Sequence, residues 1–244
     1  MARTVVVTGG SSGIGRAVAA RFVAEGDGTR VFVTGRRKER LDEVAAELGV
    51  TGVVCDGTDP AAVARLAEQV REQTGEQGGE RVDVLVNAAG GLASTPEGGG
   101  LLEQWEAMYR LNVMTAVLTT DALKDQLVAG STVISIGTIG AERRGGSYGA
   151  AKAALQAWNG FLSAELGPRG VTANVVSCGY IADTEFFQGA MTPERHAALV
   201  AETHNGRPGT PADVAETIHF LASPGARHIT GQTLHVNGGA FTTR

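Results

Sequence analysis

Short apolar runs alternate with segments of helical periodicity from one end of the chain to the other. The apolar runs predict strands at Val5–Thr8, Arg30–Thr34, Gly52–Cys55, Val82–Val86, Thr132–Ile136, Val171–Val176 and Thr233–Val236. Between them, apolar residues recur about every three or four positions, which is typical of helices with one buried face. The helices predicted in this way are Ile14–Glu25, Arg40–Leu48, a segment opened by Asp59-Pro60, Leu101–Leu123, Tyr148–Leu166 and Pro211–Ala222.

The strand Val82–Val86 has almost no polar alternation, as expected when helices cover both faces of a parallel sheet. The repeated strand–helix order predicts an α/β fold, a Rossmann-type doubly wound parallel sheet with right-handed crossovers. Because the alternation is unbroken, residues 1–244 are interpreted as a single domain. Two segments without a strand pattern, Gly90–Gly100 and Gly179–Gly209, follow strand ends, where such folds bind ligands, so we expect them to be substrate loops.

Composition and charge exclude several classes of function. The net charge is −5 and the basic residues are scattered, apart from the run Arg36-Arg37-Lys38, so no basic face for nucleic acid is expected. No apolar stretch approaches the roughly 20 residues that cross a bilayer, and the chain enters a strand at once instead of a signal peptide, so we expect no membrane partner. Cys55 and Cys178 lack metal-ligand spacing, which predicts reduced core thiols in a cytoplasmic protein and no metal ion.

The turn after the first strand reads Thr8-Gly9-Gly10-Ser11-Ser12-Gly13-Ile14-Gly15 and opens a helix. Gly9 permits a sharp turn, Gly13 lets the backbone approach a pyrophosphate, and Gly15 lets the helix pack on the strand. The start of the helix adds free N–H groups and the positive end of the helix dipole. A glycine-rich turn in this position predicts a dinucleotide site.

The end of the second strand bears on which dinucleotide is bound. An acidic residue there binds the ribose 2′-hydroxyl of NAD, but this chain has Gly35 followed by Arg36 and Arg37. A guanidinium can bind a 2′-phosphate with two parallel hydrogen bonds. We therefore expect NADP(H) to be favoured over NAD(H). The alternative is that both arginines form a solvated start to the next helix.

Tyr148 and Lys152 lie four residues apart on a predicted helix and therefore share one of its faces. Carbonyl reduction needs a proton donor at the developing alkoxide, and Tyr148 is expected to be this general acid/base. A nearby ammonium favours the phenolate, so Lys152 is expected to lower the pKa of Tyr148. Such pairs are common on helices, and the presence of both the phosphate turn and Asn87–Gly90 in the same chain makes this pair informative.

Further motifs occur in a fixed order along the whole chain. They are Asn87-Ala88-Ala89-Gly90, Asn112, Tyr148-x-x-x-Lys152, Gly206-Arg207-Pro208-Gly209-Thr210-Pro211-x-Asp213-Val214-Ala215 and Ile229-Thr230-Gly231-Gln232. Together with the first turn, they resemble the short-chain dehydrogenase/reductase family, classical type.

The resemblance implies roles for residues that spacing alone does not explain. Asn112 would hold a water that links Lys152 to solvent, and Asp56 would meet the adenine amino group. Gly179 and Ile181 would lie against the nicotinamide carboxamide. The other positions expected to contact the cofactor are Asn87, Ala88, Gly90 and, at a phosphate, Thr184.

The chain departs from the family pattern at two positions. The family has a serine just after the fifth strand that hydrogen-bonds the substrate oxygen. Here the usual gap to Tyr148 selects Ser135, whereas the local pattern Ile136-Gly137 selects Thr138, which we favour. After the sixth strand, Cys178 replaces the usual proline, which makes that turn less rigid.

The resemblance implies an NADPH-dependent reductase of ketones, similar to the 3-oxoacyl-carrier-protein reductases, with a small-molecule carbonyl or alcohol as partner. The alternative is an NADP-binding sensor or structural relative without turnover. Two predicted helices carry apolar residues beyond the needs of one sheet contact, and in the family these helices form the main dimer interface, so we expect a homotetramer (or dimer). The residues are Trp105, Met108, Met114, Leu118, Leu155, Trp158, Phe161 and Leu162.

Overall fold

The computed structural model describes residues 3–26, 28–75, 80–94, 98–187 and 189–243. These residues form a seven-stranded sheet in the order β3-β2-β1-β4-β5-β6-β7, and every neighbouring pair is parallel. The strands are β1 (Thr4–Thr8), β2 (Arg30–Gly35), β3 (Thr51–Val54), β4 (Val82–Asn87), β5 (Leu127–Thr138), β6 (Thr172–Cys178) and β7 (Thr233–Val236). The helices are α1 (Gly13–Val23), α2 (Lys38–Leu48), α3 (Pro60–Gly75), α4 (Leu101–Tyr109), α5 (Thr115–Leu123), α6 (Gly146–Leu166), α7 (Pro193–Ala201) and α8 (Pro211–Leu221).

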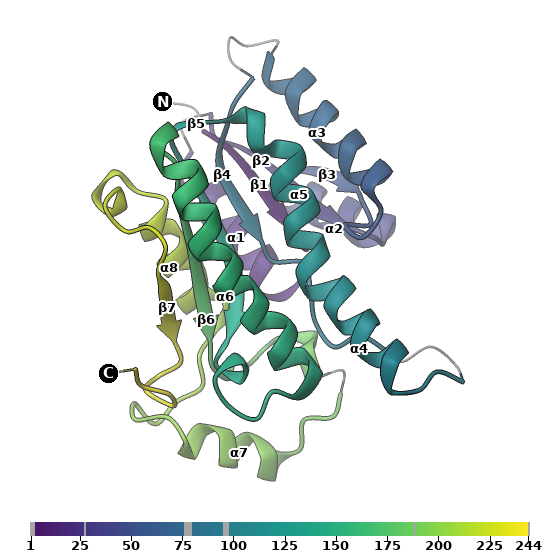
Figure 1. Cartoon of the computed structure of the whole chain (residues 1–244), viewed down its shortest axis with the longest axis vertical. Coiled ribbons are helices and arrows are strands. Elements are labelled where there is room, and N and C mark those ends of the chain that lie inside the picture. Colours follow the sequence, from purple (N-terminus) through teal and green to yellow (C-terminus); the bar gives the residue numbers. More distant parts are fainter. Residues whose placement is uncertain (1–2, 27, 76–79, 95–97, 188, 244) are drawn as a thin grey trace.

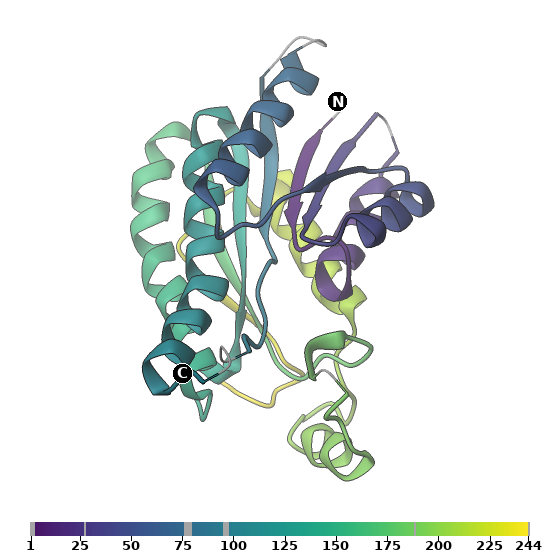
Figure 2. The same cartoon turned by 90° about the vertical axis from the view of Figure 1, so that its right-hand side faces the viewer.

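Helices cover both faces of the sheet, which confirms the predicted doubly wound α/β fold (Figures 1 and 2). The strand order reverses at β1, where β2 and β3 lie to one side and β4 to the other. At such a switch point the loops diverge on leaving the carboxyl ends of the strands and leave a crevice between them. Among the described residues, no helix is long and apolar enough to span a membrane.

The side chains of the central strand β1 alternate between two apolar layers, as the period of a strand requires. Val5 and Val7 of β1 pack in the layer covered by α1, α2 and α8, where Phe22 and Ile218 are fully buried. Val6 points to the opposite layer, which contains residues of α3, α5 and α6. Both faces of the central strand are therefore shielded from water, in agreement with its continuous apolar run.

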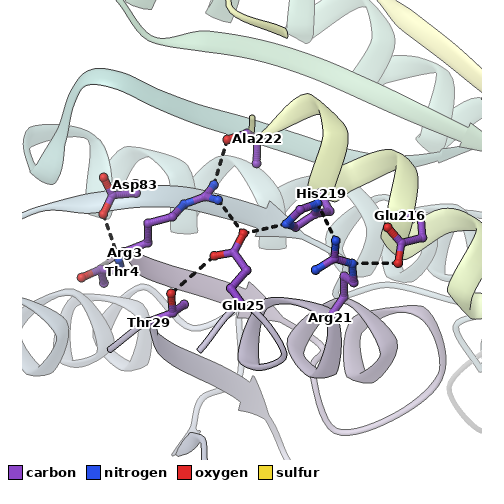
Figure 3. Close-up of polar contacts among 9 residues, drawn as sticks. All are labelled: Arg3, Thr4, Arg21, Glu25, Thr29, Asp83, Glu216, His219 and Ala222. Carbon is purple, nitrogen blue, oxygen red and sulfur yellow. Dashed lines mark hydrogen bonds and ion pairs between the residues drawn. The ribbon is translucent and has the colours of Figure 1, made fainter. Parts of the chain in front are cut away.

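A polar cluster joins α1 to α8 near the amino ends of the strands (Figure 3). The Glu25 carboxylate accepts from Arg3 at 2.8 Å and contacts Nε2 of His219 at 2.6 Å. Arg21 lies 3.0 Å from Nδ1 of His219 and also pairs with Glu216. Because Arg21 donates to Nδ1, the imidazole carries its proton on Nε2 and donates it to Glu25.

The structure corrects three of the predicted segments. The fifth strand is longer than Thr132–Ile136 and extends to Thr138. The helix predicted over Leu101–Leu123 is divided by a π-helical turn at Arg110–Met114, which contains one more residue per turn than an α-helix. Gly179–Gly209 is not wholly irregular, because α7 lies within it.

Helix α7 lies beyond the carboxyl ends of the strands (Figure 2). Its first turn is capped by Thr192, whose hydroxyl accepts from the N–H of Arg195. Hydrogen bonds of 3.0 and 2.9 Å between Gly209 and the Tyr180–Ala182 backbone close the base of this excursion. The segment is thus a defined cover for the neighbouring crevice. Of the other predicted substrate loop, residues 95–97 lie outside the described part of the chain.

Candidate active site

A cavity of about 1580 Å³ lies at the carboxyl ends of the strands. It exceeds the range of roughly 300–1,000 Å³ typical of small-molecule pockets, so it has room for a large cofactor and a substrate together. Residues from the ends of β1 to β6 line it. All of the predicted cofactor positions are among them except Asn87: Gly9, Ser11, Ser12, Gly13, Ile14, Gly15, Arg36, Arg37, Asp56, Ala88, Gly90, Tyr148, Lys152, Gly179, Ile181 and Thr184.

The turn between β1 and α1 forms one end of the cavity. Gly9 has a φ of +66°, and a Cβ there would lie 2.9 Å from the backbone of Ala89. A Cβ on Gly15 would lie 2.4 Å from the carbonyl oxygen of Gly9, so both positions exclude a side chain. Ser12 precedes the helix without capping it through its side chain, and the first turn contains no acidic residue. The first N–H groups of α1 are thus available to an anion.

Some of the charged groups beside this turn form ion pairs, and others do not. Arg37 lies 3.7 Å from Glu185, which also accepts hydrogen bonds from Arg40. Asp56 accepts from the backbone and side chain of Thr58; the backbone N–H holds the pKa of its carboxyl below the usual value, and Arg36 adds in the same direction. Arg36 is exposed and lines the cavity.

Gly35, at the end of β2, faces the phosphate turn. A Cβ at this position would lie 3.0 Å from the hydroxyl of Ser11, so a larger side chain would crowd the turn. NAD enzymes carry an acidic residue at this position, whereas this chain has a glycine. The next side chain along the chain is the guanidinium of Arg36.

Tyr148 and Lys152 come from the first turns of α6 and both line the cavity. Lys152 is buried and its Nζ donates to the carbonyl oxygen of Ile136 at 2.9 Å. Burial lowers the pKa of Lys152 to about 8. Burial also raises the pKa of Tyr148, and the neighbouring Cys178 adds to this rise. Lys152 is not among the causes of this rise, so its expected lowering of the Tyr148 pKa stays a prediction.

Asn112 lies in the π-helical turn and is fully buried. Its side chain exchanges hydrogen bonds of 2.9 Å with the backbone N–H and carbonyl of Gly91, and it also donates to Met108. The amide thus fixes the loop that follows β4 beside Lys152, since a Cβ on Gly90 would meet both Asn112 and the lysine Nζ. Asn112 does not line the cavity, and its role in holding a water stays a prediction.

Thr138 and Ser135 occupy different environments. Ser135 is buried within β5, between Asn87 of β4 and Val175 of β6. Thr138 ends β5, lines the cavity, and accepts a hydrogen bond of 3.1 Å from the N–H of Gly140. The proton of the Thr138 hydroxyl remains free to be donated into the cavity.

The chain matches known proteins along its whole length. A family model described as "Enoyl-(Acyl carrier protein) reductase" matches residues 9–241. The 3-oxoacyl-[acyl-carrier-protein] reductase FabG of Escherichia coli (strain K12) is 33% identical over 246 residues, covering 98% of this chain and 97% of that relative. The chain belongs to the short-chain dehydrogenase/reductase family. Membership confirms the resemblance and the expectation of an oxidoreductase that acts on carbonyl or alcohol groups.

Two solved structures share this fold. A short chain dehydrogenase from Burkholderia cenocepacia J2315, in complex with NADP, is 32% identical with a TM-score of 0.85, covering 98% of this chain and 97% of that chain. A blue fluorescent protein from a metagenomic library, in complex with NADPH, is 35% identical with a TM-score of 0.86, covering 98% of each chain. The high TM-scores show that this chain and the two solved structures have the same overall fold.

Cys178 stands where short-chain dehydrogenases/reductases commonly have proline. The thiol is buried, lines the cavity beside Lys152, and makes a contact of 3.8 Å with the carbonyl of Val176. Burial raises its pKa to about 12, so it is a neutral, unreactive thiol at ordinary pH. Asn87 is likewise buried, and its amide donates to Thr120 at 2.9 Å, which directs it away from the cavity.

The sequence analysis did not single out several residues that line the cavity together with Tyr148: Arg143, Arg144, Phe186, Phe187 and Leu199. The ring of Phe186 lies 5.2 Å from that of Tyr148. The two phenylalanines are adjacent in the sequence, and so are the two arginines, but neither pair lies in a segment with strand or helix periodicity. Only the fold shows that both pairs line the same cavity.

Proposed function

We propose that this chain is an NADPH-dependent reductase of ketones, with 3-oxoacyl thioesters as the leading substrate class. The observation that carries the proposal is the composition of one cavity. A phosphate-binding turn lies at one end, and Tyr148, Lys152 and Thr138 lie at the other. The same residues would serve the reverse oxidation of a secondary alcohol.

The residues present fit NADP(H). The free N–H groups of α1 suit the pyrophosphate, and Gly9 and Gly15 leave the turn open to it. Arg36 suits the 2′-phosphate, since Glu185 engages Arg37 and Arg40 but not Arg36. The complexes of two relatives with NADP and NADPH support the same preference. When bound, the nicotinamide supplies the hydride.

The remaining chemistry falls to side chains of this chain. The Tyr148 hydroxyl would donate its proton to the carbonyl oxygen as that oxygen gains electron density. The Thr138 hydroxyl would donate a hydrogen bond to the same oxygen. Lys152, held by the carbonyl of Ile136, would place a positive charge near the developing alkoxide. Asp56 would bind the adenine end and Asn112 would hold a water next to Lys152.

The first experiment is steady-state oxidation of NADPH and NADH over ketones, 3-oxoacyl thioesters and 2-enoyl thioesters, with Tyr148→Phe beside the wild type. We expect turnover of the oxo compounds with NADPH and its loss in the variant. Turnover of enoyl thioesters alone would overturn the substrate class and favour the activity that the family model describes. Tight NADPH binding without turnover on any compound would favour the sensing alternative.

Arg36→Ala tests the cofactor. We expect the affinity for NADPH to fall by about tenfold or more while that for NADH changes little, because only NADPH carries the 2′-phosphate. Equilibrium fluorescence titrations measure both affinities without turnover. An unchanged ratio of the two affinities would contradict the assignment of Arg36.

We also propose a homotetramer, with a dimer as the smaller alternative, in the cytoplasm. Helices α4 and α6 contact each other, and both expose large apolar side chains (Figure 1). Of the side chains expected at the interface, Trp105 and Phe161 are exposed, whereas Met108, Leu155 and Leu162 are buried within the chain. Leu101, Leu102 and Tyr109 are exposed as well. Cys55 and Cys178 are free thiols, in keeping with a reducing compartment.

A further inference from the structure

A rigid loop carries two arginines to the catalytic end of the cavity. It connects β5 to α6, and the N–H groups of Glu142 and Arg143 both donate to the carbonyl of Ile139, at 3.1 and 3.2 Å. A Cβ on Gly145 would lie 2.0 Å from the carbonyl oxygen of Gly140, so this loop is packed without spare space. Arg144 follows in the left-handed region, with a φ of +51°. Such a backbone persists only where its surroundings hold it.

The three charged residues of this loop, Glu142, Arg143 and Arg144, lie in different surroundings. The Glu142 carboxylate accepts from Gln156 at 2.6 Å and lies 3.5 Å from His235, so it faces α6 and β7. Arg143 pairs with Glu202, just beyond α7. Arg144 is exposed and lines the cavity, and within the described part of the chain it has no hydrogen bond or ion pair.

The other charged groups of the described cavity wall, apart from Arg36 beside the glycine-rich turn, have partners. Glu202 is bound to Arg143, Glu185 to Arg37 and Arg40, and Asp56 to Thr58. Lys152 donates to a backbone carbonyl, and Arg36 lies close enough to Asp56 to lower its pKa. Among the described residues near Tyr148, Arg144 is therefore the lining cation that has neither an ion pair nor a hydrogen bond.

Facing this cation, the wall near Tyr148 is apolar. Phe186 packs on the ring of Tyr148, Phe187 packs edge-on against Phe186 at 5.1 Å, and Leu199 of α7 also lines the cavity. A substrate with its carbonyl at Tyr148 would have an apolar surface on one side and a positive charge at the rim. An acidic group on the substrate would find its counter-ion there.

We infer that Arg144 is a specificity residue that selects carbonyl substrates carrying an anionic group, a carboxylate or a phosphate, at a distance from the ketone. The inference rests on the proposed function and deepens it. A guanidinium suits both groups because its fork of N–H donors matches two acceptor oxygens. The packed loop fixes the point at which the Arg144 side chain leaves the backbone, beside the cavity.

The test compares pairs of substrates that differ in charge. One pair is a series of oxo acids of increasing length against their methyl esters, which tests a carboxylate. The other is acetoacetyl-coenzyme A against the acetoacetyl thioester of N-acetylcysteamine, which tests a phosphate. For Arg144→Asn we expect KM to rise about tenfold for the charged member of one pair, with kcat unchanged and the neutral member unaffected. Asparagine is chosen because it tolerates the left-handed region.

Two further variants serve as controls. Arg144→Lys keeps the charge and should retain most of the preference. Arg227→Asn removes another exposed arginine that has no ion pair among the described residues and lies outside the cavity lining, so it should change nothing. Affinity of the same compounds for the NADPH-loaded Tyr148→Phe protein, with and without Arg144→Asn, is measured by cofactor fluorescence and repeats the comparison without turnover.

Each outcome has a defined meaning. A change confined to the oxo acids identifies a carboxylate, and one confined to the coenzyme A ester identifies a phosphate. Equal effects on charged and neutral members, or none on either, would overturn the inference while neutral ketones are still reduced. Failure to reduce any ketone would instead count against the proposed function, and the binding comparison would still decide the role of Arg144.

Discussion

Burial moves the pKa values of Tyr148 and Lys152 in opposite directions, and both movements follow from the same cost of desolvating a charge. The phenol keeps its proton more firmly than a free tyrosine does, while the ammonium of Lys152 loses its proton more readily, with a pKa of about 8. At neutral pH the phenol is protonated and the lysine is still mostly charged. This is the protonation state that a carbonyl reductase needs before it donates a proton.

Lys152→Met should change how stability depends on pH. Because the pKa of Lys152 falls from 10.5 to about 8 on folding, the unfolded chain binds the proton more tightly between these values. In wild type the free energy of unfolding therefore gains up to about 3 kcal/mol from this group as pH rises from 8 to 10.5. Denaturant titrations across this range should show wild type gaining stability relative to the variant. A difference that does not change with pH would contradict the buried, charged lysine.

Thr138→Val should lower kcat/KM by about a hundredfold, since it removes a donor to the developing oxyanion. Ser135→Ala is the matched control, because Ser135 is buried within β5 and does not line the cavity. It should retain near wild-type activity, as should Thr138→Ser. The reverse ranking of the two hydroxyl deletions in the same assay would assign the role to Ser135.

At the scale of elements, α1 and α8 are joined by a carboxylate that is mostly buried. The Glu25 side chain is 17% exposed and contacts Arg3 and His219 (Figure 3). The Arg3 guanidinium also lies 5.2 Å from the ring centre of Phe22 and donates to the carbonyl of Ala222. Removing one partner would leave the others partly buried without a hydrogen bond, which lowers the free energy of unfolding.

Glu25→Gln should lower the free energy of unfolding by about 1–3 kcal/mol, because it weakens two charge-assisted contacts in a partly buried site. Glu216→Gln is the control: it removes a partner of Arg21, but its side chain is 62% exposed, so the loss should be near zero. Urea denaturation measures both variants. Similar losses in the two would show that exposure does not set the value of these contacts.

The sequence was sufficient to predict the helices and strands whose apolar residues face the core, and insufficient to predict those without buried residues. The strands and α1, α6 and α8 carry buried apolar residues at regular spacing. Helix α7 has none that is buried, so periodicity could not reveal it, although Thr192-Pro193 is a helix-start signal. The π-helical turn leaves no compositional mark. The sequence singled out the Tyr148–Lys152 pair and the glycine-rich turn because local spacing defines them, whereas the place of Arg144 beside Phe186 depends on the folding of two loops that are distant in the sequence.

At the scale of the whole molecule, the apolar surface of α4 and α6 is expected to be covered by a second copy. Trp105→Glu should place a charge in that interface and shift the molecule to a smaller species in size-exclusion chromatography with light scattering. Val54→Glu is the control, because Val54 is also an exposed apolar residue but lies on β3, at the edge of the sheet. A wild-type monomer at working concentration would contradict the proposed assembly.

The π-helical turn at Arg110–Met114 joins the surface of α4 to the interior of the molecule. An α-helix turns about 100° per residue, so deleting one residue from α4 or α5 would rotate the outer face of α4, with Trp105, by that angle relative to α5. The π-helical turn holds an additional residue, so it can lose one by closing to an α-helical turn that keeps the two helices in phase. Asn112, which fixes Gly91 beside the lysine, lies within the same turn. A deletion within this turn would therefore spare the outer face of α4 and act on the position of Asn112. A chain that loses a single residue here would keep its mode of association but would have to hold the loop after β4 in another way.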